Sequence, residues 1–272
     1  MGRVPVSQNA SGSDDAIPRR GLSGRIAVVT GAESGIGAAC AAELAAAGAA
    51  IAIFYYQDEE AARRTQAAAP GSAVIQCDVS SEASVEAAFS ELGASVGAPD
   101  ILINSAGLNQ SGVAVADMGL EQWNRLMATD LTGAFLTCRR FVRDLRAAKK
   151  PGAIVNISSI HASAVRAGAA DYDAAKAGLD RLTATLALET ARLGINVNAI
   201  APGMILTPMN AHAVADETYR ASLERSIPWG RAGRPEEVAR LAAFLVSPAA
   251  DYITGATVTI DGGLSLVLGQ GA

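Results

Sequence analysis

A tyrosine and a lysine four positions apart, Tyr172 and Lys176, form a pair whose chemistry depends on its spacing. Residues four apart lie on one face of a helix, so the two side chains are expected to point the same way. A phenol titrates near about 10 in water and needs a nearby cation before it can act as a base near neutral pH. The pair therefore predicts proton transfer, although this spacing alone also occurs often by chance.

A glycine-rich turn stands near the start of the chain, where residues 30–37 read Thr-Gly-Ala-Glu-Ser-Gly-Ile-Gly. Glycines at this spacing let a backbone turn tightly and approach a pyrophosphate. A helix that follows offers free N–H groups and the positive end of its dipole. Such a turn alone is a weak signal, but between a first strand and a first helix it predicts a bound dinucleotide.

The segments around these residues alternate between short apolar runs and longer helical stretches. The runs are rich in β-branched residues at consecutive positions, as strands covered on both faces are. They comprise residues 25–30, 50–54, 73–77, 100–104, 153–158, 195–200 and 256–260. Because right-handed crossovers place helices on both faces, the pattern predicts one α/β domain, a doubly wound Rossmann-type fold with a seven-stranded parallel sheet. This domain is expected at 24–272, behind a disordered leader at 1–23.

Several motifs in combination resemble the short-chain dehydrogenases/reductases. In chain order they are TGxxxGxG at 30–37, NSAG at 104–107, a strand ending at Ser158-Ser159, YDAAK at 172–176 and Pro202-Gly203. The resemblance covers residues 24–263 and implies hydride transfer between NAD(P) and a carbonyl or alcohol carbon, with no metal ion. It implies that Tyr172 exchanges the proton and that Lys176 binds the nicotinamide ribose. Ser159, 13 residues before Tyr172, would then hold the substrate oxygen.

The same resemblance, with the rule that open α/β sheets bind ligands at the carboxyl ends of their strands, predicts the dinucleotide site. Asp78 is expected to accept the adenine amino group, and Ile205 and Thr207 to contact the nicotinamide amide. The expected cofactor-binding residues are Gly31, Ser34, Gly35, Ile36, Gly37, Tyr55, Tyr56, Asp78, Val79, Asn104, Ala106, Gly107, Tyr172, Lys176, Pro202, Gly203, Ile205 and Thr207. An Asp after a strand is also an ordinary turn or helix-capping residue, so Asp78 alone is ambiguous.

One position departs from the family pattern. Where the family usually carries an asparagine before Leu-Thr-Gly, this chain carries Asp130. If the family residue works through its backbone carbonyl and a water leading to the lysine, Asp130 can substitute for it. If the side-chain amide must donate, the relay is weakened or retuned. A third interpretation is that Asp130 is a tolerated polar residue of its helix.

The choice between NAD and NADP is normally made just past the second strand, where an acidic residue holds the ribose hydroxyls or an arginine holds the 2′-phosphate. Here Tyr55 and Tyr56 occupy these positions, and Ser34 stands where an arginine is often found, beside Glu33. With one nearby anion and no evident cation, charge favours NAD over NADP as the cofactor. The two arginines of the next helix could reverse this preference.

The segment at about 206–230 is expected to form a mobile substrate lid. TPMNA at 207–211 and SIPWGRAGRPEEVA at 226–239 resemble the glucose and related aldose 1-dehydrogenases, which implies a sugar substrate. His161 would then face the pocket or be solvated, and Trp229 is expected to pack rather than stack on a sugar. A ketone or 3-oxoacyl reductase would share the catalytic residues and differ in the lid. A non-catalytic dinucleotide-binding protein would be expected to lack the Ser, Tyr or Lys.

The composition excludes other classes of function. A net charge of −5 gives no basic field for nucleic acid or an anionic membrane. No apolar run of about 18 residues marks a membrane span. The three cysteines form no CxxC pair, so buried, reduced thiols and a cytoplasmic protein are expected. The pair Arg19-Arg20 suggests a twin-arginine export signal, but the apolar stretch after it is better explained as the first strand.

The end of the chain is apolar after residues 261–263. Its large aliphatic residues are Leu264, Leu266, Val267 and Leu268. On a monomer they would form an exposed patch, which soluble proteins seldom tolerate. The family resemblance implies that this region meets a symmetry mate, so a homotetramer is expected, unless the tail folds back onto its own core.

Overall fold

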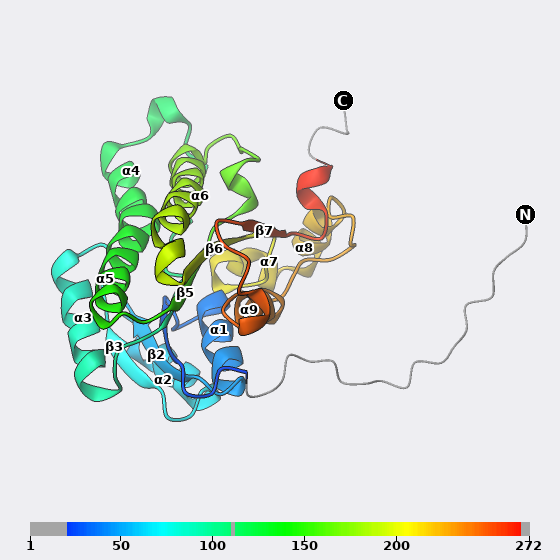
Figure 1. Cartoon of the computed structure of the whole chain (residues 1–272). Coiled ribbons are helices and arrows are strands. Elements are labelled where there is room, and N and C mark those ends of the chain that lie inside the picture. The colour runs from blue at the N-terminus through cyan, green and yellow to red at the C-terminus, as the bar shows by residue number, and fades with distance from the viewer. Residues whose placement is uncertain (1–20, 110–111, 268–272) are drawn as a thin grey trace, which may run out of the picture.

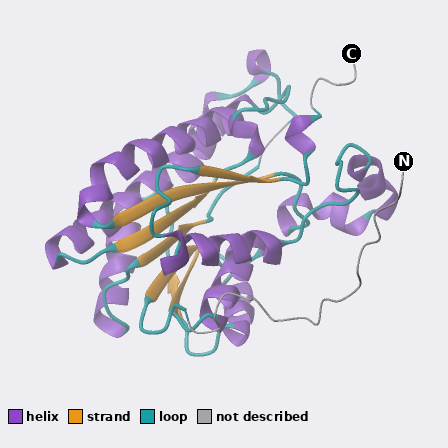
Figure 2. Cartoon of the chain, turned by 45° about the vertical axis from the view of Figure 1, so that its right-hand side comes forward, coloured by secondary structure: helices purple, strands orange, loops and turns teal. Residues whose placement is uncertain are grey.

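The computed structural model of the chain describes residues 21–109 and 112–267. Within them, seven parallel strands form one sheet in the order β3-β2-β1-β4-β5-β6-β7. Helices cover both of its faces (Figure 1, Figure 2). The chain winds outward from β1 to β3 and begins again at β4, on the other side of β1. The doubly wound parallel sheet predicted from the sequence is confirmed, and its strand order reverses between β1 and β4.

Each strand begins and ends within two residues of its expected position. The strands are β1 Ile26–Thr30, β2 Ala50–Tyr55, β3 Ala73–Gln76, β4 Ile101–Asn104, β5 Gly152–Ile157, β6 Ile195–Pro202 and β7 Thr257–Ile260. The helices are α1 Gly35–Ala46, α2 Glu59–Ala68, α3 Glu82–Ser95, α4 Leu120–Met127, α5 Gly133–Ala148, α6 Ala170–Thr190, α7 Ala211–Ala215, α8 Glu217–Glu224 and α9 Pro235–Leu245. A π-helical turn at Ala128–Thr132, η2, joins α4 to α5.

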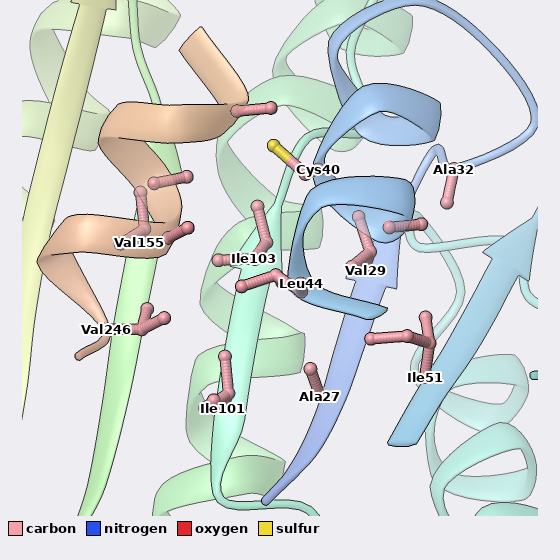
Figure 3. Packing of buried hydrophobic residues seen from close by; sticks show 14 of the residues in the cluster. Ala27, Val29, Ala32, Cys40, Leu44, Ile51, Ile101, Ile103, Val155 and Val246 are labelled. Carbon is pink, nitrogen blue, oxygen red and sulfur yellow. The ribbon is translucent and has the colours of Figure 1, made fainter. Parts of the chain in front are cut away.

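The sheet separates two hydrophobic cores, because successive side chains of a strand point to opposite faces. Ala27 and Val29 of β1 lie in the core under α1 and α9, with Leu44 of α1 and Val246 just past α9 (Figure 3). Val28 points the other way, into the core formed with α3, α5 and α6. Burial on both faces is the reason that the strands are apolar at consecutive positions.

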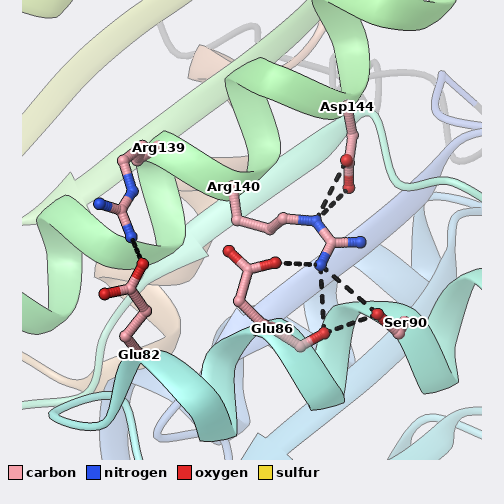
Figure 4. Close-up of polar contacts among 6 residues, drawn as sticks. All are labelled: Glu82, Glu86, Ser90, Arg139, Arg140 and Asp144. Atoms are coloured by element: carbon pink, nitrogen blue, oxygen red, sulfur yellow. Dashed lines mark hydrogen bonds and ion pairs between the residues drawn. The ribbon is translucent and has the colours of Figure 1, made fainter.

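A set of ion pairs fixes α5 to α3 at the surface of the second core (Figure 4). The Arg140 guanidinium donates hydrogen bonds to the backbone carbonyl and carboxylate of Glu86 and to Asp144, and Arg139 pairs with Glu82. Isolated surface pairs contribute about 0–1 kcal/mol each. Together these pairs hold α5 against α3, and the η2 turn leads directly into α5.

The folded part of the chain begins earlier than the sequence suggested. Leu22 is 1 % exposed and belongs to the core under α1, and its N–H donates to the Ala47 carbonyl. The expected C-terminal boundary of the leader, residue 23, is therefore too late, because the folded part already includes Leu22. The rest of the leader, with Arg19-Arg20, lies outside the described residues, as does Leu268. None of the helices within 21–109 and 112–267 is long and apolar enough to cross a bilayer.

Candidate active site

A cavity of about 970 Å³ lies at the carboxyl ends of the strands. It is lined by the loops that follow β1 to β6 and by the segment after Pro202, which contributes Met209, Ala213, Leu223 and Ile227. Open α/β sheets bind ligands at this edge, next to the point where the strand order reverses. The expected lid at about 206–230 thus forms one wall of the cavity, and it contains the short helices α7 and α8.

The glycine-rich turn is packed so tightly that larger residues do not fit. A Cβ on Gly31 would lie 2.7 Å from the Ala106 Cα, and a Cβ on Gly37 would lie 2.3 Å from the Gly31 carbonyl oxygen. Thr30 ties the same loops together, since its hydroxyl accepts hydrogen bonds from the N–H groups of Ser105 and Ala106 at 3.1 Å. The loop therefore holds its backbone close to the start of α1, as a pyrophosphate cradle requires. Gly37 supports this loop from behind and does not line the cavity.

A carboxylate stands where the ribose of a dinucleotide is expected. Glu33 lines the cavity, and its Oε1 accepts a hydrogen bond from the Tyr56 N–H at 3.2 Å. Its Oε2 is buried and has no hydrogen-bond partner among the described residues. Tyr56 also lines the cavity, but Tyr55 is 8 % exposed and points into the core under α1. The Tyr55 side chain is therefore not placed to contact the cofactor, because the last residue of β2 faces inward.

The arginines that could have reversed the cofactor preference lie elsewhere. Arg63 pairs with Glu59 at 3.0 Å and Arg64 with Glu60 at 2.8 Å, each within one turn of α2. Neither arginine lines the cavity. Asp78 does line it, beside Val79, and its Oδ1 accepts hydrogen bonds from the Ser80 N–H and hydroxyl. Both the turn-forming and the ligand-facing interpretations of Asp78 therefore fit its position.

The three expected catalytic side chains meet in the same cavity. Ser159, just after β5, and Tyr172 and Lys176 on α6 all line it. The Lys176 Nζ lies 5.4 Å from the centre of the Tyr172 ring and donates to the Ile157 carbonyl at 3.2 Å. Burial opposes the charged form of Lys176, but the attractions of Asp130, Tyr172 and Asp180 together exceed it and raise the pKa of the lysine above its ordinary value, with Asp130 the largest of them. The lysine is therefore held as a cation beside the phenol.

Asp130 contacts the lysine directly. Its Oδ2 lies 3.1 Å from the Lys176 Nζ, and its Oδ1 accepts a hydrogen bond from the Leu108 N–H at 2.7 Å. Burial, which the Lys176 cation partly offsets, raises the pKa of Asp130. A Cβ on Gly107 would lie 2.9 Å from the Asp130 Oδ2, so only glycine leaves room for this pair.

A polar network lies beneath the catalytic side chains and holds two strands to two helices. The Asn104 amide donates to the Asn156 side chain at 2.9 Å, and Asn156 donates to Thr183 at 2.9 Å. The Thr137 hydroxyl donates to Asn104 at 2.7 Å. Because Asn104 is buried in this network and does not line the cavity, its side chain is not placed for the expected cofactor contact. Its position in the sequence marks the strand end, not the direction of its side chain.

His161 and Trp229 lie in different places relative to the cavity. His161 lines the cavity, its ring lies 6.1 Å from the Tyr172 ring, and its Nδ1 lies 2.7 Å from the Ala164 carbonyl oxygen. Of the two alternatives, pocket-facing and solvated, this position favours the pocket-facing one. Trp229 is 72 % exposed and lines a smaller cavity beside Asp261. Trp229 does not line the main cavity, and it packs against Gly262 with most of its surface exposed.

Several lining residues were not expected from the sequence. They are Gln57, Ser105, Leu108, Asn109, Arg125, Ala128, Thr129, Arg166 and Met204. Most of them belong to loops or to the α4–η2 segment, where no periodic pattern indicates direction. Position after a strand was the one available signal, and it could have indicated Ser105 and Leu108.

The three cysteines belong to the two hydrophobic cores, and Cys77 also lines the cavity. Cys40, Cys77 and Cys138 are free and buried, and burial raises the pKa of each thiol to about 12. This confirms the expectation of buried, unpaired thiols. Over residues 21–109 and 112–267, no group of three His, Cys, Asp or Glu side chains is placed to hold a metal ion.

Comparisons with known proteins agree with this geometry. The family described as Enoyl-(Acyl carrier protein) reductase matches residues 31–265. The chain is 44 % identical to 3beta-hydroxysteroid dehydrogenase 1 of Eggerthella lenta, over 91 % of this chain and 96 % of the relative. It is 41 % identical to cis-4-hydroxycyclohexanecarboxylate dehydrogenase of Sinomonas cyclohexanicum, over 89 % and 97 %. A crystal structure of a candidate 2-deoxy-D-gluconate 3-dehydrogenase of Agrobacterium tumefaciens with bound NADP has a TM-score of 0.82 at 35 % identity, covering 91 % and 99 %.

Proposed function

Because the chain belongs to the short-chain dehydrogenase/reductase family and is an NAD(P)-dependent oxidoreductase of CH–OH and carbonyl groups, we propose that Tyr172 is its proton-transfer group. One observation carries this proposal: Ser159, Tyr172 and Lys176 line the same cavity as the glycine-rich turn. A reacting carbon placed at the Tyr172 hydroxyl is then within the cavity that holds the dinucleotide. The non-catalytic alternative lacks support, because all three side chains are present and converge.

Each residue has a distinct task in this reaction. The bound dinucleotide supplies the carbon that accepts or donates the hydride. In oxidation the Tyr172 phenolate oxygen takes the proton from the alcohol oxygen, in reduction the Tyr172 hydroxyl returns it to the carbonyl oxygen, and the Ser159 hydroxyl donates a hydrogen bond to that oxygen. Lys176, held by Ile157 and Asp130, binds the ribose and places its charge beside the phenol. The lid excludes water from the reacting atoms.

The preferred dinucleotide is NAD, and Glu33 is the residue that selects it. A buried carboxylate oxygen without a partner needs a donor, and the ribose hydroxyls of NAD supply donors at this place in the fold. A 2′-phosphate there would meet the same charge and be repelled. The unpartnered Oε2 and the distant arginines of α2 both support this preference. A relative with bound NADP makes a direct comparison of the two cofactors the necessary test.

Glu33→Gln is expected to shift the ratio of the NADPH and NADH dissociation constants by about tenfold toward NADPH, because removing one repelled charge is worth about 1.4 kcal/mol. Titration calorimetry with both reduced dinucleotides measures the ratio. Glu60→Gln, the same charge change on the exposed face of α2, is the control and should leave the ratio unchanged. A parent protein that binds NADPH tenfold or more tightly than NADH would contradict the NAD preference.

The substrate is a secondary alcohol on an apolar ring, or the corresponding ketone. The lid presents Met209, Ala213, Leu223 and Ile227 to the cavity. The Ser226 hydroxyl instead donates to the Leu223 carbonyl at 2.7 Å and the Asn210 amide to the Ile205 carbonyl at 2.7 Å, so these two polar groups are already satisfied by backbone carbonyls. Relatives named for a hydroxysteroid and a hydroxycyclohexanecarboxylate support the same class. The aldose interpretation of the lid motifs is the alternative.

A substrate panel tests this proposal. Initial rates of nicotinamide reduction should be highest with cyclohexanols and hydroxysteroids, lower with aldoses and absent with primary alcohols. The reverse assay uses ring ketones and 3-oxoacyl thioesters. Aldoses or 3-oxoacyl thioesters as the best substrates, by tenfold or more in kcat/KM, would overturn the ring-alcohol assignment while keeping the family's chemistry.

The proposal also includes a homotetramer in the cytoplasm. The three unpaired cysteines support a reducing compartment. The exposed apolar side chains Leu188, Tyr252 and Leu266 support assembly, although Leu264 lines the cavity and the apolar patch is smaller than expected.

Light scattering should give about four times the chain mass of 27.6 kDa. A mass near one chain would refute the assembly. Deleting residues 264–272 should lower both the assembly state and the thermal midpoint.

A further inference from the structure

We infer that Asp130 is a positioning residue that moves the proton exchange of Tyr172 to higher pH, by placing a negative charge against the Lys176 cation. This inference rests on the acid–base role proposed above for Tyr172. It also gives a specific task to the carboxylate that replaces the usual asparagine of the family. An asparagine could accept one hydrogen bond at this place but would bring no charge.

The geometry requires an acceptor on both sides of the Asp130 side chain. One carboxylate oxygen accepts the Leu108 N–H at 2.7 Å, and the other lies 3.1 Å from the Lys176 Nζ. An asparagine whose oxygen accepted the Leu108 N–H would turn its own NH2 group toward the ammonium. A carboxylate accepts the Leu108 N–H with one oxygen and places the other, negatively charged, against the ammonium as an ion pair, which an asparagine cannot do.

Other charged groups around the pair are further from the ammonium or occupied elsewhere. Over the described ranges, Asp130 is the one carboxylate within 4 Å of the Lys176 Nζ. Asp171 accepts hydrogen bonds from Gln122 and from the Tyr172 N–H. Asp180, one turn beyond Lys176 on α6, contributes the weakest of the attractions on the lysine. The His161 ring lies 6.1 Å from the Tyr172 ring, and its Nδ1 is 3.9 Å from the Asp173 carboxylate, which accepts the Arg166 N–H. Asp130 therefore dominates the local charge balance.

The consequence follows from the sign of the charges. A cation beside a phenol stabilises the phenolate, and a carboxylate in contact with that cation cancels part of the effect. The cancellation is strong because both groups are buried and solvent screens them little. The Tyr172 hydroxyl therefore keeps its proton to higher pH than an asparagine in this position would allow. Carbonyl reduction, which needs the protonated hydroxyl, continues through neutral pH, and alcohol oxidation rises at higher pH.

Asp130→Asn tests the inference through the pH profile. The acidic limb of kcat/KM for alcohol oxidation is expected to move toward lower pH by about one unit, the scale of a charge pair at an effective dielectric constant of about 20. Asp180→Asn, a matched change on α6, is expected to move it by less than about 0.3 unit. A residue that only supports the fold would lower the rate at every pH and leave the limb in place.

A second readout works without turnover or cofactor. The tyrosinate absorbance at 295 nm is titrated in the parent and in the Tyr172→Phe variant, and their difference isolates Tyr172. The same difference in the Asp130→Asn background should have a midpoint about one unit lower. If circular dichroism shows that the Asp130→Asn variant does not fold, the titration is done on Asp130→Ser, which removes the same charge with a smaller side chain.

The outcomes separate this inference from the proposed function. An unchanged titration midpoint in the folded Asp130 variant overturns the inference, because Asp130 then carries no charge or does not act on Tyr172. A lowered midpoint supports it. Turnover in the Tyr172→Phe variant within tenfold of the parent overturns the role of Tyr172 in the proposed function, whatever the midpoint does.

Discussion

Tyr172→Phe is expected to lower kcat by about 10³-fold, within the range of 10²–10⁴ that general acid–base groups contribute. Phe keeps the ring that packs against Leu126, Ala169 and Ala175, so the fold and the cavity should persist. The variant loses only the oxygen that exchanges the proton. The dissociation constant of NADH should stay within about threefold of the parent, because the proposed function assigns the ribose to Lys176, which the variant keeps. Stopped-flow kinetics and fluorescence titration measure the two quantities.

The control for this variant is Tyr252→Phe. Tyr252 is fully exposed, so the same loss of one hydroxyl should leave kcat unchanged. A Tyr172→Phe enzyme that keeps more than a tenth of the parent kcat would remove Tyr172 from the mechanism. If the variant also loses NADH binding, the substitution has disrupted the structure of the site, and the fall in kcat cannot be assigned to proton transfer.

Gly37→Ala is expected to weaken NADH binding by about 100-fold and to lower the thermal midpoint by several degrees, since overpacking a rigid site costs about 1–3 kcal/mol. The added Cβ would lie 2.3 Å from the Gly31 carbonyl oxygen and 3.1 Å from the Ala32 Cα. Both neighbours are backbone atoms of the pyrophosphate loop, so the loop itself must move. Titration calorimetry and thermal melts measure the loss.

Gly93→Ala is the matched control for that change. Gly93 lies in α3, and a Cβ there would meet nothing within 4 Å. Alanine in a helix interior is favoured over glycine by about 0.5–1 kcal/mol, so this variant should melt slightly higher and bind NADH as the parent does. Equal NADH binding by the Gly37 and Gly93 variants would contradict the role assigned to the packing of the loop.

Most of the fold could be predicted from the sequence because the sheet is buried on both faces. Val28 and Val29 enter opposite cores, and that requirement places apolar residues at successive positions, where they are visible without coordinates. The pair Tyr172 and Lys176 is predictable for the same reason, since helical geometry alone puts both on one face. Leu22 was not, because a single leucine in a polar segment has no periodicity to indicate that it is buried.

The directions of side chains at strand ends could not be predicted. Tyr55 and Tyr56 are adjacent and chemically identical, but one enters the core and the other lines the cavity. Asn104 lies at a strand end and turns inward to Asn156. Glu33 acquires its position from a contact with the Tyr56 N–H, 23 residues away, and a contact at that separation leaves no local pattern. The ion pair of Asp130 with Lys176 is tertiary in the same way.

The transfer of deuterium tests the central claim most directly. The protein and NAD are incubated with the best alcohol of the panel, which carries deuterium on its carbinol carbon. The mass of the reduced dinucleotide is then measured by mass spectrometry. Direct hydride transfer between substrate and nicotinamide predicts a product one mass unit heavier than with unlabelled alcohol. Reduced dinucleotide without the label, or none with any alcohol of the panel, would contradict it.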